Sequence, residues 1–260
     1  MNPVVRFIRR YTENFSYTVR WGIARGMKRK GGLQFIPQIT RLRAEEKLLM
    51  GLNLTGKTIY DIGGFEGIFT LYFSRAAGPG GNVVTFEPNP VNQNKINANL
   101  SLNGITNVRL LRKGVGSGPG TFTLVVPSGE RESGTVHAKA QERYAFPGKK
   151  DTEYTISVDS LDNMLAQENL RPPHLMKIDI EGFENEALRG ARNLISSHKP
   201  QLHIEVHTHV FDDEEQKRSY LTELIGILHG YNYRITCVET GVEVRGINNG
   251  LFEESHFYCV

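Results

Sequence analysis

From residue 57 onward, short apolar runs alternate with segments of helical periodicity, and this alternation constrains the fold more than any other feature. Strands that are separated by helices pair in parallel, because each crossover helix carries the chain back to the same edge of the sheet. We therefore expect one doubly wound α/β domain with a mainly parallel sheet. The expected strands are residues 57–62, 82–87, 108–115, 121–126, 154–158, 175–180 and 201–206, and two late strands at 231–238 and 256–260 are expected to be antiparallel at one edge.

The helices are predicted from their stop and start signals. A helix over 68–77 ends at Gly78-Pro79-Gly80-Gly81, and another begins with Asn89 as N-cap and Pro90 in the first turn. Further helices are expected after Ser160, over 183–194 and over 214–229. Residues 127–150 are polar and have no period, which indicates a long loop over the site.

The charge divides the chain into a basic arm, residues 1–43, and a domain, residues 44–260. The arm holds ten basic side chains and one acid, Glu13, although the whole chain has a net charge of only +3. The rest of the chain is therefore acidic, so we expect no nucleic-acid partner.

Within the arm, Val4, Ile8, Tyr11 and Phe15 recur at helical spacing. A basic amphipathic helix of this kind suits contact with an anionic membrane surface or glycan, an organellar transit peptide, or packing on the domain. Two cysteines, Cys237 and Cys259, form no disulfide framework, and no apolar stretch reaches the roughly 20 residues needed to span a bilayer. The expected location is the cytoplasm, with peripheral membrane contact through residues 1–43 left open.

The first strand ends in Asp61-Ile-Gly63-Gly64-Phe-Glu66-Gly67, directly before a helix. Glycines at this point let the backbone approach a ligand. Glu87 ends the next strand, where an acid can accept hydrogen bonds from the ribose of an adenosine. The two features predict a nucleoside across the carboxyl ends of the first two strands.

The charge of this turn discriminates between nucleosides. A dinucleotide brings a pyrophosphate, which Asp61 and Glu66 would repel, and its Gly-x-Gly-x-x-Gly fingerprint is broken here. S-adenosylmethionine carries no phosphate and two cationic groups, so the acids favour it. The alternatives are an NAD-dependent oxidoreductase and a non-catalytic adapter that binds membrane or glycan through its arm.

Charged side chains alternate along two core strands that should be central. Lys177, Asp179 and Glu181 share one face of the first, and His203, Glu205, His207 and His209 share one face of the next. An alcohol acceptor must lose a proton during methyl transfer, and a carboxylate or imidazole can accept it. Asp179 is the first choice for this base, followed by His203, His207 and Glu181, and Lys177 is expected to keep the acids ionised. No metal is predicted, although two neighbours in the histidine row together with Asp179 could bind a divalent ion.

Four motifs together resemble the FkbM family of methyltransferases. They are Asp61-Ile-Gly-Gly-Phe-Glu-Gly-Ile-Phe-Thr-Leu71, Phe86-Glu87-Pro88-Asn89, Leu161-Asp162, and Lys177-Ile-Asp179-Ile-Glu181-Gly-Phe-Glu184, of which the last is the most specific. The resemblance covers residues 57 to about 209. It implies a seven-stranded Rossmann-like methyltransferase fold, S-adenosylmethionine as methyl donor, and O-methylation of a hydroxyl on a sugar, glycan or other small molecule.

The resemblance also implies roles for single residues. Asp61, Gly63 and Gly67 would line the methionine end of the donor, Glu87 would hold the ribose, and Lys113-Gly114 would lie near the adenine. The predicted cofactor-binding residues are Asp61, Gly63, Gly64, Gly67, Glu87, Asn89 and Gly114, and the predicted catalytic residues are Asp179, Glu181, Lys177 and His203. One departure stands out, because the family usually has Ala-Asn where this chain has Gly64-Phe65.

Overall fold

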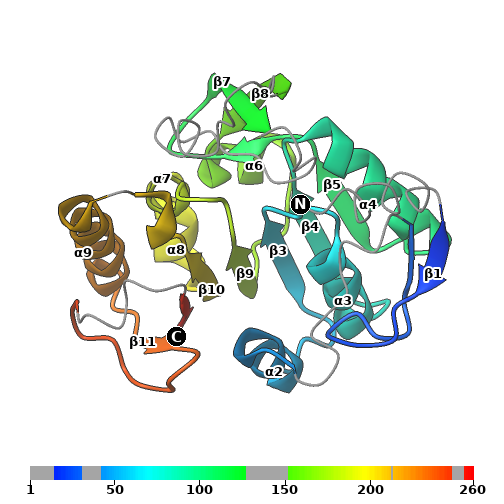
Figure 1. Cartoon of the computed structure of the whole chain (residues 1–260), viewed down its shortest axis with the longest axis horizontal. Helices are drawn as coiled ribbons and strands as arrows, with labels where there is room; N and C mark the ends of the chain where they lie inside the picture. The colour runs from blue at the N-terminus through cyan, green and yellow to red at the C-terminus, as the bar shows by residue number, and fades with distance from the viewer. Residues whose placement is uncertain (1–14, 31–41, 127–151, 212, 248–254) are drawn as a thin grey trace, which may run out of the picture.

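A seven-stranded sheet forms the centre of the protein in the computed structural model, which describes residues 15–30, 42–126, 152–211, 213–247 and 255–260 (Figure 1). The strand order is β11-β12-β10-β9-β3-β4-β5. The bounds are β3 (Thr58–Ile62), β4 (Asn82–Phe86), β5 (Val108–Leu111), β9 (Leu175–Ile178), β10 (Gln201–Val206), β11 (Ile235–Cys237) and β12 (Ser255–Cys259). β12 is antiparallel to both of its neighbours, and the other pairings are parallel. The predicted α/β fold is confirmed, including the antiparallel late strands at one edge.

Alternation along the strands gives the sheet two different faces. Tyr60, Ile62, Met176 and Ile178 belong to an apolar core that continues into the last four helices. These helices are α6 (Leu161–Gln167), α7 (Glu184–Arg189), α8 (Arg192–His198) and α9 (Glu214–Gly230). A continuous apolar face buried under helices is typical of a parallel sheet.

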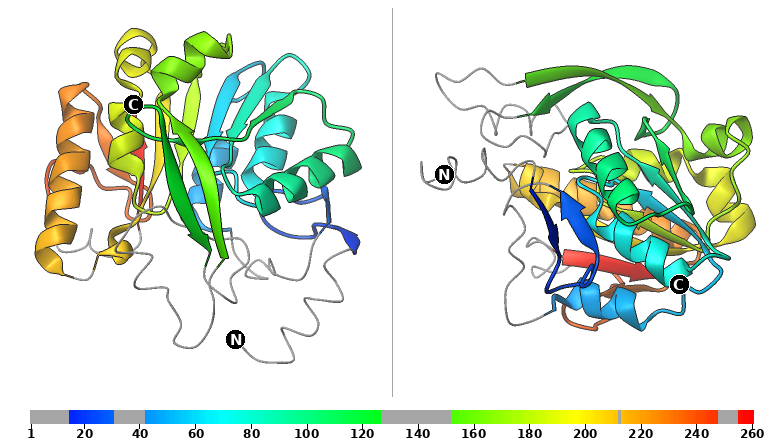
Figure 2. Two further views of the ribbon diagram at one scale, coloured as in Figure 1. Left: turned by 90° about the horizontal axis from the view of Figure 1, so that it is seen from above. Right: turned by 90° about the vertical axis from the view of Figure 1, so that its right-hand side faces the viewer.

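The opposite face packs on α2 (Ala44–Gly51) and α3 (Ile68–Ala77), and α4 (Pro90–Leu102) follows β4 next to α3 (Figure 2). Ile59, Val83 and Leu175 bury their side chains there against Leu49 and Phe73. Toward β9, β10 and β12 this face becomes polar, because Lys177, His203, Glu205 and His256 stand at facing positions of neighbouring strands. The polar half of this face positions the candidate site.

The predicted strand 108–115 is wrong in one respect, because it divides between two sheets. β5 ends at Leu111, and β6 (Gly114–Val115) joins β7 (Gly120–Val126) and β8 (Thr152–Asp159) in a separate three-stranded sheet of order β6-β8-β7. Glycine at position 114 allows the chain to leave the large sheet and pack closely on β8, since a Cβ on this residue would lie 3.0 Å from Val158 Cγ2. The predicted loop 127–150 lies outside the described residues.

The predicted helix 183–194 is also divided, into α7 and α8. The break falls at Gly190, where a Cβ would lie 1.9 Å from the carbonyl oxygen of Gly116. Both carboxylate oxygens of Asp162 accept hydrogen bonds from the amides of Asn193 and Leu194, which cap the new helix start. The helix is therefore interrupted by a close backbone contact that only the tertiary fold provides.

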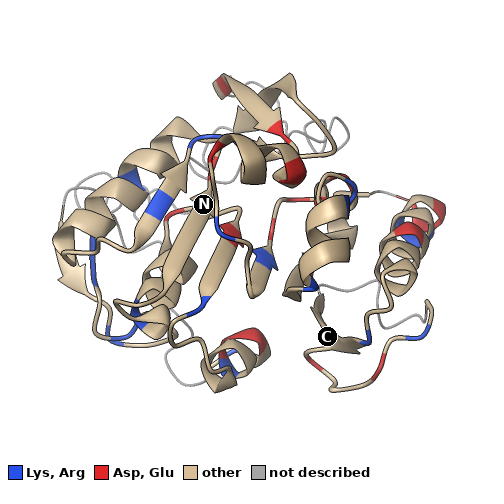
Figure 3. Ribbon diagram, turned by 180° about the vertical axis from the view of Figure 1, so that it is seen from behind, with Lys and Arg blue, Asp and Glu red and all other residues tan. Residues whose placement is uncertain are grey.

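Residues 15–30 are part of the domain and not a free arm. They form a hairpin of β1 (Ser16–Thr18) and β2 (Lys28–Lys30), three residues that are all basic (Figure 3). Ile23 is buried in the core beside α2 and α3, and the amide of Lys30 donates to Asn99 Oδ1 on α4 at 2.7 Å. The helix predicted around Val4 to Phe15 lies almost wholly outside the described residues. Among the helices that the structure describes, none combines the length and apolar character needed to cross a membrane.

Candidate active site

The loop after β3 turns sharply because three of its residues adopt left-handed backbone conformations. Gly63 and Gly67 have φ values of +85° and +86°, and Phe65 has +50°. A Cβ on Gly63 would lie 1.8 Å from the carbonyl oxygen of Asp179, and one on Gly64 would lie 2.3 Å from Thr85 Cγ2. Glycine is therefore required at the first position by both conformation and space, and the loop lies directly against the end of β9.

Two buried acids flank this loop, as predicted. Asp61 accepts a hydrogen bond from Thr70 Oγ1 at 2.6 Å through Oδ2, and burial raises the pKa of Asp61 to about 6. Glu87 accepts from the amides of Phe65 and Asn89 at 2.7 and 2.8 Å, and burial raises its pKa to about 7. Glu87 thus fixes the loop to the start of α4, and a carboxylate has further acceptor positions for ribose hydroxyls.

The remaining predicted cofactor residues lie around the same corner. Asn89 is the N-cap of α4, as predicted, because its Oδ1 accepts from the amide of Val91 at 2.9 Å. Gly114 is buried, and a Cβ on it would lie 3.8 Å from Pro88, which follows Glu87. Their contacts with a cofactor stay predictions.

The interpretation of Glu66 as an acid that faces the ligand is wrong. Its side chain is 2% exposed and forms ion pairs with Arg29 of β2 and with Lys95 of α4. Two cations neutralise the carboxylate, so it cannot repel a pyrophosphate. Arg29 of the hairpin, which was expected only as part of a basic arm, contacts the cofactor loop through this ion pair with Glu66.

Lys177 and Asp179 form the predicted pair at the end of β9. Lys177 Nζ lies 2.6 Å from Asp179 Oδ2, and the lysine side chain is 1% exposed. Burial alone would raise the pKa of Asp179, but Lys177 and His207 outweigh it and lower the value to about 2. Asp179 is thus held as an anion, and a carboxylate that holds protons so weakly is a poor base.

Glu181 lies outside the strand that was expected to carry it. β9 ends at Ile178, and Glu181 has a φ of +54°, a conformation that is costly for a residue with a Cβ. Its carboxylate is 31% exposed and lies 3.9 Å from His207 and 3.8 Å from His209. Burial and the neighbouring carboxylates, chiefly Asp179 and Glu205, raise the pKa of Glu181 to about 7.

His207 connects the acids of this end of the sheet. Its Nδ1 lies 2.8 Å from Glu184 Oε1, and its Nε2 lies 3.5 Å from Asp179 Oδ1. Burial opposes a charge on the imidazole, but the carboxylates of Glu184, Asp179 and Glu181 outweigh it and raise the pKa of His207 to about 10. His207 is therefore a buried cation at neutral pH.

His203 lies away from solvent on the polar face of the sheet. It is fully buried, both ring nitrogens lack a hydrogen bond within the described structure, and burial lowers its pKa to about 3. A neutral, buried imidazole is in no position to contact an acceptor directly. His209, which was expected on the same strand face, belongs to the short 3-10 helix η1 (Thr208–Val210).

The residues at the corner fit S-adenosylmethionine. Asp61 Oδ1 is buried without a hydrogen-bond partner in the part of the chain that the structure describes, so it can accept a donor such as an ammonium group. Asp61 and Glu87 would hold the methionine and ribose ends, and the glycine backbone would allow close approach between them. When bound, the group would supply a methyl group on a positively charged sulfur.

Comparison with known proteins gives similarity at three levels. The chain is 27% identical over 143 residues to Methyltransferase 1 of Beauveria bassiana and 30% identical over 154 residues to Methyltransferase sdnD of Sordaria araneosa. Each match covers 51% of this chain, and the chain spans 57% and 59% of those two proteins. Among solved structures, the FkbM methyltransferase of Methylobacillus flagellatus is 20% identical with a TM-score of 0.49, and the match covers 81% of this chain and 45% of that one.

The family comparison covers most of the domain. The Methyltransferase FkbM domain matches residues 61–235, from the first acid of the cofactor loop to β11. This match confirms the predicted family and, at the level of that family, S-adenosylmethionine as cofactor. The protein that presents this glycine loop beside the Lys177–Asp179 pair belongs to the FkbM methyltransferase family.

Proposed function

We propose that this protein transfers the methyl group of S-adenosylmethionine to a hydroxyl oxygen of a sugar, a glycan or another small hydroxylated molecule. The observation that carries the proposal is the difference in pKa between two neighbouring acids after β9, Asp179 and Glu181. Lys177 keeps the pKa of Asp179 at about 2, whereas burial raises that of Glu181 to about 7. Such a divergence of neighbouring groups is typical of acid–base sites.

Glu181 is the better candidate for the base, although Asp179 was the first choice from the sequence. A base works best with a pKa near the working pH, and Glu181 meets this condition while remaining partly exposed. Its carboxylate accepts the proton that the acceptor hydroxyl loses when its oxygen is methylated. The proton stays on Glu181, and S-adenosylmethionine, which Asp61 and Glu87 would hold, would supply the methyl group and leave as a neutral thioether.

The neighbouring charged residues hold Glu181 in place for this step. His207 presents a positive charge 3.9 Å from the carboxylate and is itself held by Glu184. The carboxylate of Asp179 pairs with Lys177. Its backbone carbonyl oxygen lies so close to Gly63 of the cofactor loop that a Cβ on Gly63 would be 1.8 Å away. The base is thereby fixed relative to the cofactor corner, which is the condition for aligning acceptor and donor.

Methyl transfer to small hydroxylated molecules can be tested with a labelled donor. The purified protein is incubated with S-adenosylmethionine carrying a deuterated methyl group and with monosaccharide, glycan and phenol libraries, and products are separated by mass spectrometry. We expect a labelled methyl ether that wild type forms and Glu181→Gln forms at least about 100-fold more slowly. Label on nitrogen or carbon alone would contradict O-methylation.

A further inference from the structure

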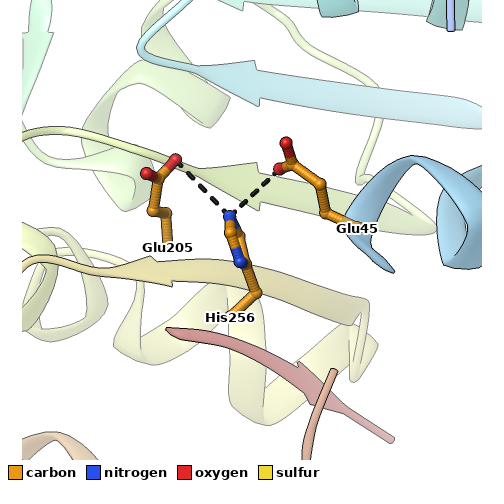
Figure 4. Close-up of side chains that lie close together, drawn as sticks. All are labelled: Glu45, Glu205 and His256. Carbon is orange, nitrogen blue, oxygen red and sulfur yellow. Dashed lines mark ion pairs between the residues drawn. The ribbon is translucent and has the colours of Figure 1, made fainter. Parts of the chain in front are cut away.

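A second group of titratable residues lies beside the candidate active site and is not used in the proposed reaction. Glu45 comes from the first turn of α2, Glu205 from β10 and His256 from β12 (Figure 4). Glu205 and His256 stand directly opposite each other on paired strands, and α2 covers them. Two of these three residues lie outside the stretch 61–235 that matches the family domain.

The three side chains converge on one point. His256 Nε2 lies 3.1 Å from Glu45 Oε2 and 3.7 Å from Glu205 Oε2, and Figure 4 shows both carboxylates pointing toward this nitrogen. Two ligands that each lie about 2.1 Å from one ion in a tetrahedral arrangement are separated by about 3.4 Å. The spacing therefore suits a shared cation without a large movement of the backbone.

Glu45 and His256 are held together as an ion pair, with Oε2 and Nε2 3.1 Å apart. Glu45 and His256 are 4% and 7% exposed, yet Glu45 Oε2 and His256 Nε2 make no well-aligned hydrogen bond within the described residues. The fully buried His203 packs its ring 5.4 Å from that of His256 and also lacks partners for both nitrogens. Two carboxylates that converge on one buried imidazole nitrogen, beside a second buried imidazole, form a donor set that a divalent cation can use.

The other side of His256 is arranged as in a metal-bound histidine. His256 Nδ1 lies 2.6 Å from Glu239 Oε1, and the amide of His256 donates to Glu239 Oε2 at 3.0 Å. A carboxylate at this nitrogen fixes the ring and directs Nε2 toward Glu45 and Glu205, as in histidines that bind a metal. Three carboxylates, those of Glu45, Glu205 and Glu239, surround this single imidazole.

We propose that Glu45, Glu205 and His256 bind one first-row divalent cation between α2 and the polar face of the sheet. One imidazole and two carboxylates suit Mn²⁺ and Zn²⁺, with Zn²⁺ the tighter of the two. The neighbouring set of Asp179, Glu205 and His207 is the competing location. It is less suited to a cation, because Lys177 already places a positive charge 2.6 Å from Asp179.

The test measures binding on the full chain after treatment with a chelator and desalting. Mn²⁺ is titrated, and the free ion is followed by its electron paramagnetic resonance signal. We expect saturation at one Mn²⁺ per chain and displacement of Mn²⁺ by Zn²⁺. Substitution of a residue that only supports a ligand typically weakens metal affinity by about 10- to 100-fold. We expect Glu239→Gln to weaken Mn²⁺ affinity within that range, and Glu45→Gln, which removes a proposed ligand, to weaken it by more than about 100-fold.

His207→Gln is the matched control, because it removes the competing set and leaves the proposed ligands in place. Retained Mn²⁺ binding in this variant supports the proposal, whereas loss in His207→Gln with retention in Glu45→Gln overturns it. Absence of saturable binding to the wild type overturns it as well. If Glu45→Gln fails to fold, as circular dichroism would show, anomalous diffraction from Mn²⁺-soaked wild-type crystals decides by the presence or absence of a peak at His256 Nε2.

Discussion

Titration of Glu181 should control the rate of methyl transfer near neutral pH. Burial and the surrounding carboxylates raise the pKa of Glu181 to about 7. The ionised fraction then rises from about one eleventh at pH 6 to about ten elevenths at pH 8. Since only the ionised form can accept a proton, we expect kcat to increase about tenfold over this interval and then to level off.

The substitution that tests this is Glu181→Gln, which keeps the size of the side chain and removes its titration. We expect kcat to fall by about 10²- to 10⁴-fold and the rise between pH 6 and 8 to disappear. The assay is release of labelled product under saturating S-adenosylmethionine at fixed ionic strength. Binding of the donor, measured by calorimetry, should change little, because Asp61 and Glu87 carry the predicted contacts.

Several other titratable groups lie near Glu181, and their effect on the rate must be distinguished from that of Glu181. They are His207 and His209 from the segment after β10, Asp179 and Glu184 from the ends of β9 and α7, and Glu205 from β10. His209→Gln is the matched control, because a histidine can titrate in the same interval and lies 3.8 Å from Glu181. The reasoning is refuted if Glu181→Gln keeps the pH-dependent rise, or if His209→Gln removes it while Glu181 is intact.

Three further predictions concern the supports of the site. Gly63→Ala should prevent binding of S-adenosylmethionine and lower the melting temperature, because its Cβ would overlap the carbonyl oxygen of Asp179. If calorimetry shows wild-type affinity in this variant, the role of Gly63 in the loop is contradicted. Arg29→Met should lower the free energy of unfolding by about 3 kcal/mol, measured by urea titration, because it removes one of the two cations that pair with buried Glu66. Arg29→Met/Glu66→Leu should recover only part of the loss, since Lys95 then also loses its partner. Asp179→Asn should lower the free energy of unfolding by about 3 kcal/mol above pH 4, because buried Lys177 loses its charged partner. The lowered pKa of Asp179 stabilises the fold only where the carboxylate is ionised, so the difference from wild type should shrink as the pH falls from 4 toward 2. A constant difference over that interval would contradict the last prediction.

The core strands and most helices could be predicted because their signals are local. α3 occupies the predicted residues 68–77 and ends before Gly78, and β10 occupies the predicted residues 201–206. Asn89 caps α4 as its position before Pro90 indicated. Apolar period, capping residues and glycine stops act over a few neighbours, so a single sequence contains them in full.

The deviations arise where distant backbone segments meet. The break at Gly190 depends on the carbonyl group of Gly116, and Glu181 leaves the strand pattern because the chain turns at a positive φ after β9. The pairing of Glu205 with His256 depends on β12 being inserted between β10 and β11. No local pattern contains these contacts, and for this reason Glu45 and His256 were not among the predicted site residues.

Of the two acids in the cofactor loop, only Asp61 bears on the choice of cofactor. In the sequence Asp61 and Glu66 look equivalent, but Arg29 and Lys95 neutralise Glu66 in the fold. Asp61 keeps one buried oxygen without a hydrogen-bond partner among the described residues. The preference for a cationic nucleoside therefore depends on Asp61, on its Oδ1 in particular, and not on the summed charge of the turn. A buried acceptor without a hydrogen-bond partner favours a ligand that brings a donor to it. The choice of ligand therefore depends on which acids are paired within the protein and which remain available to a ligand.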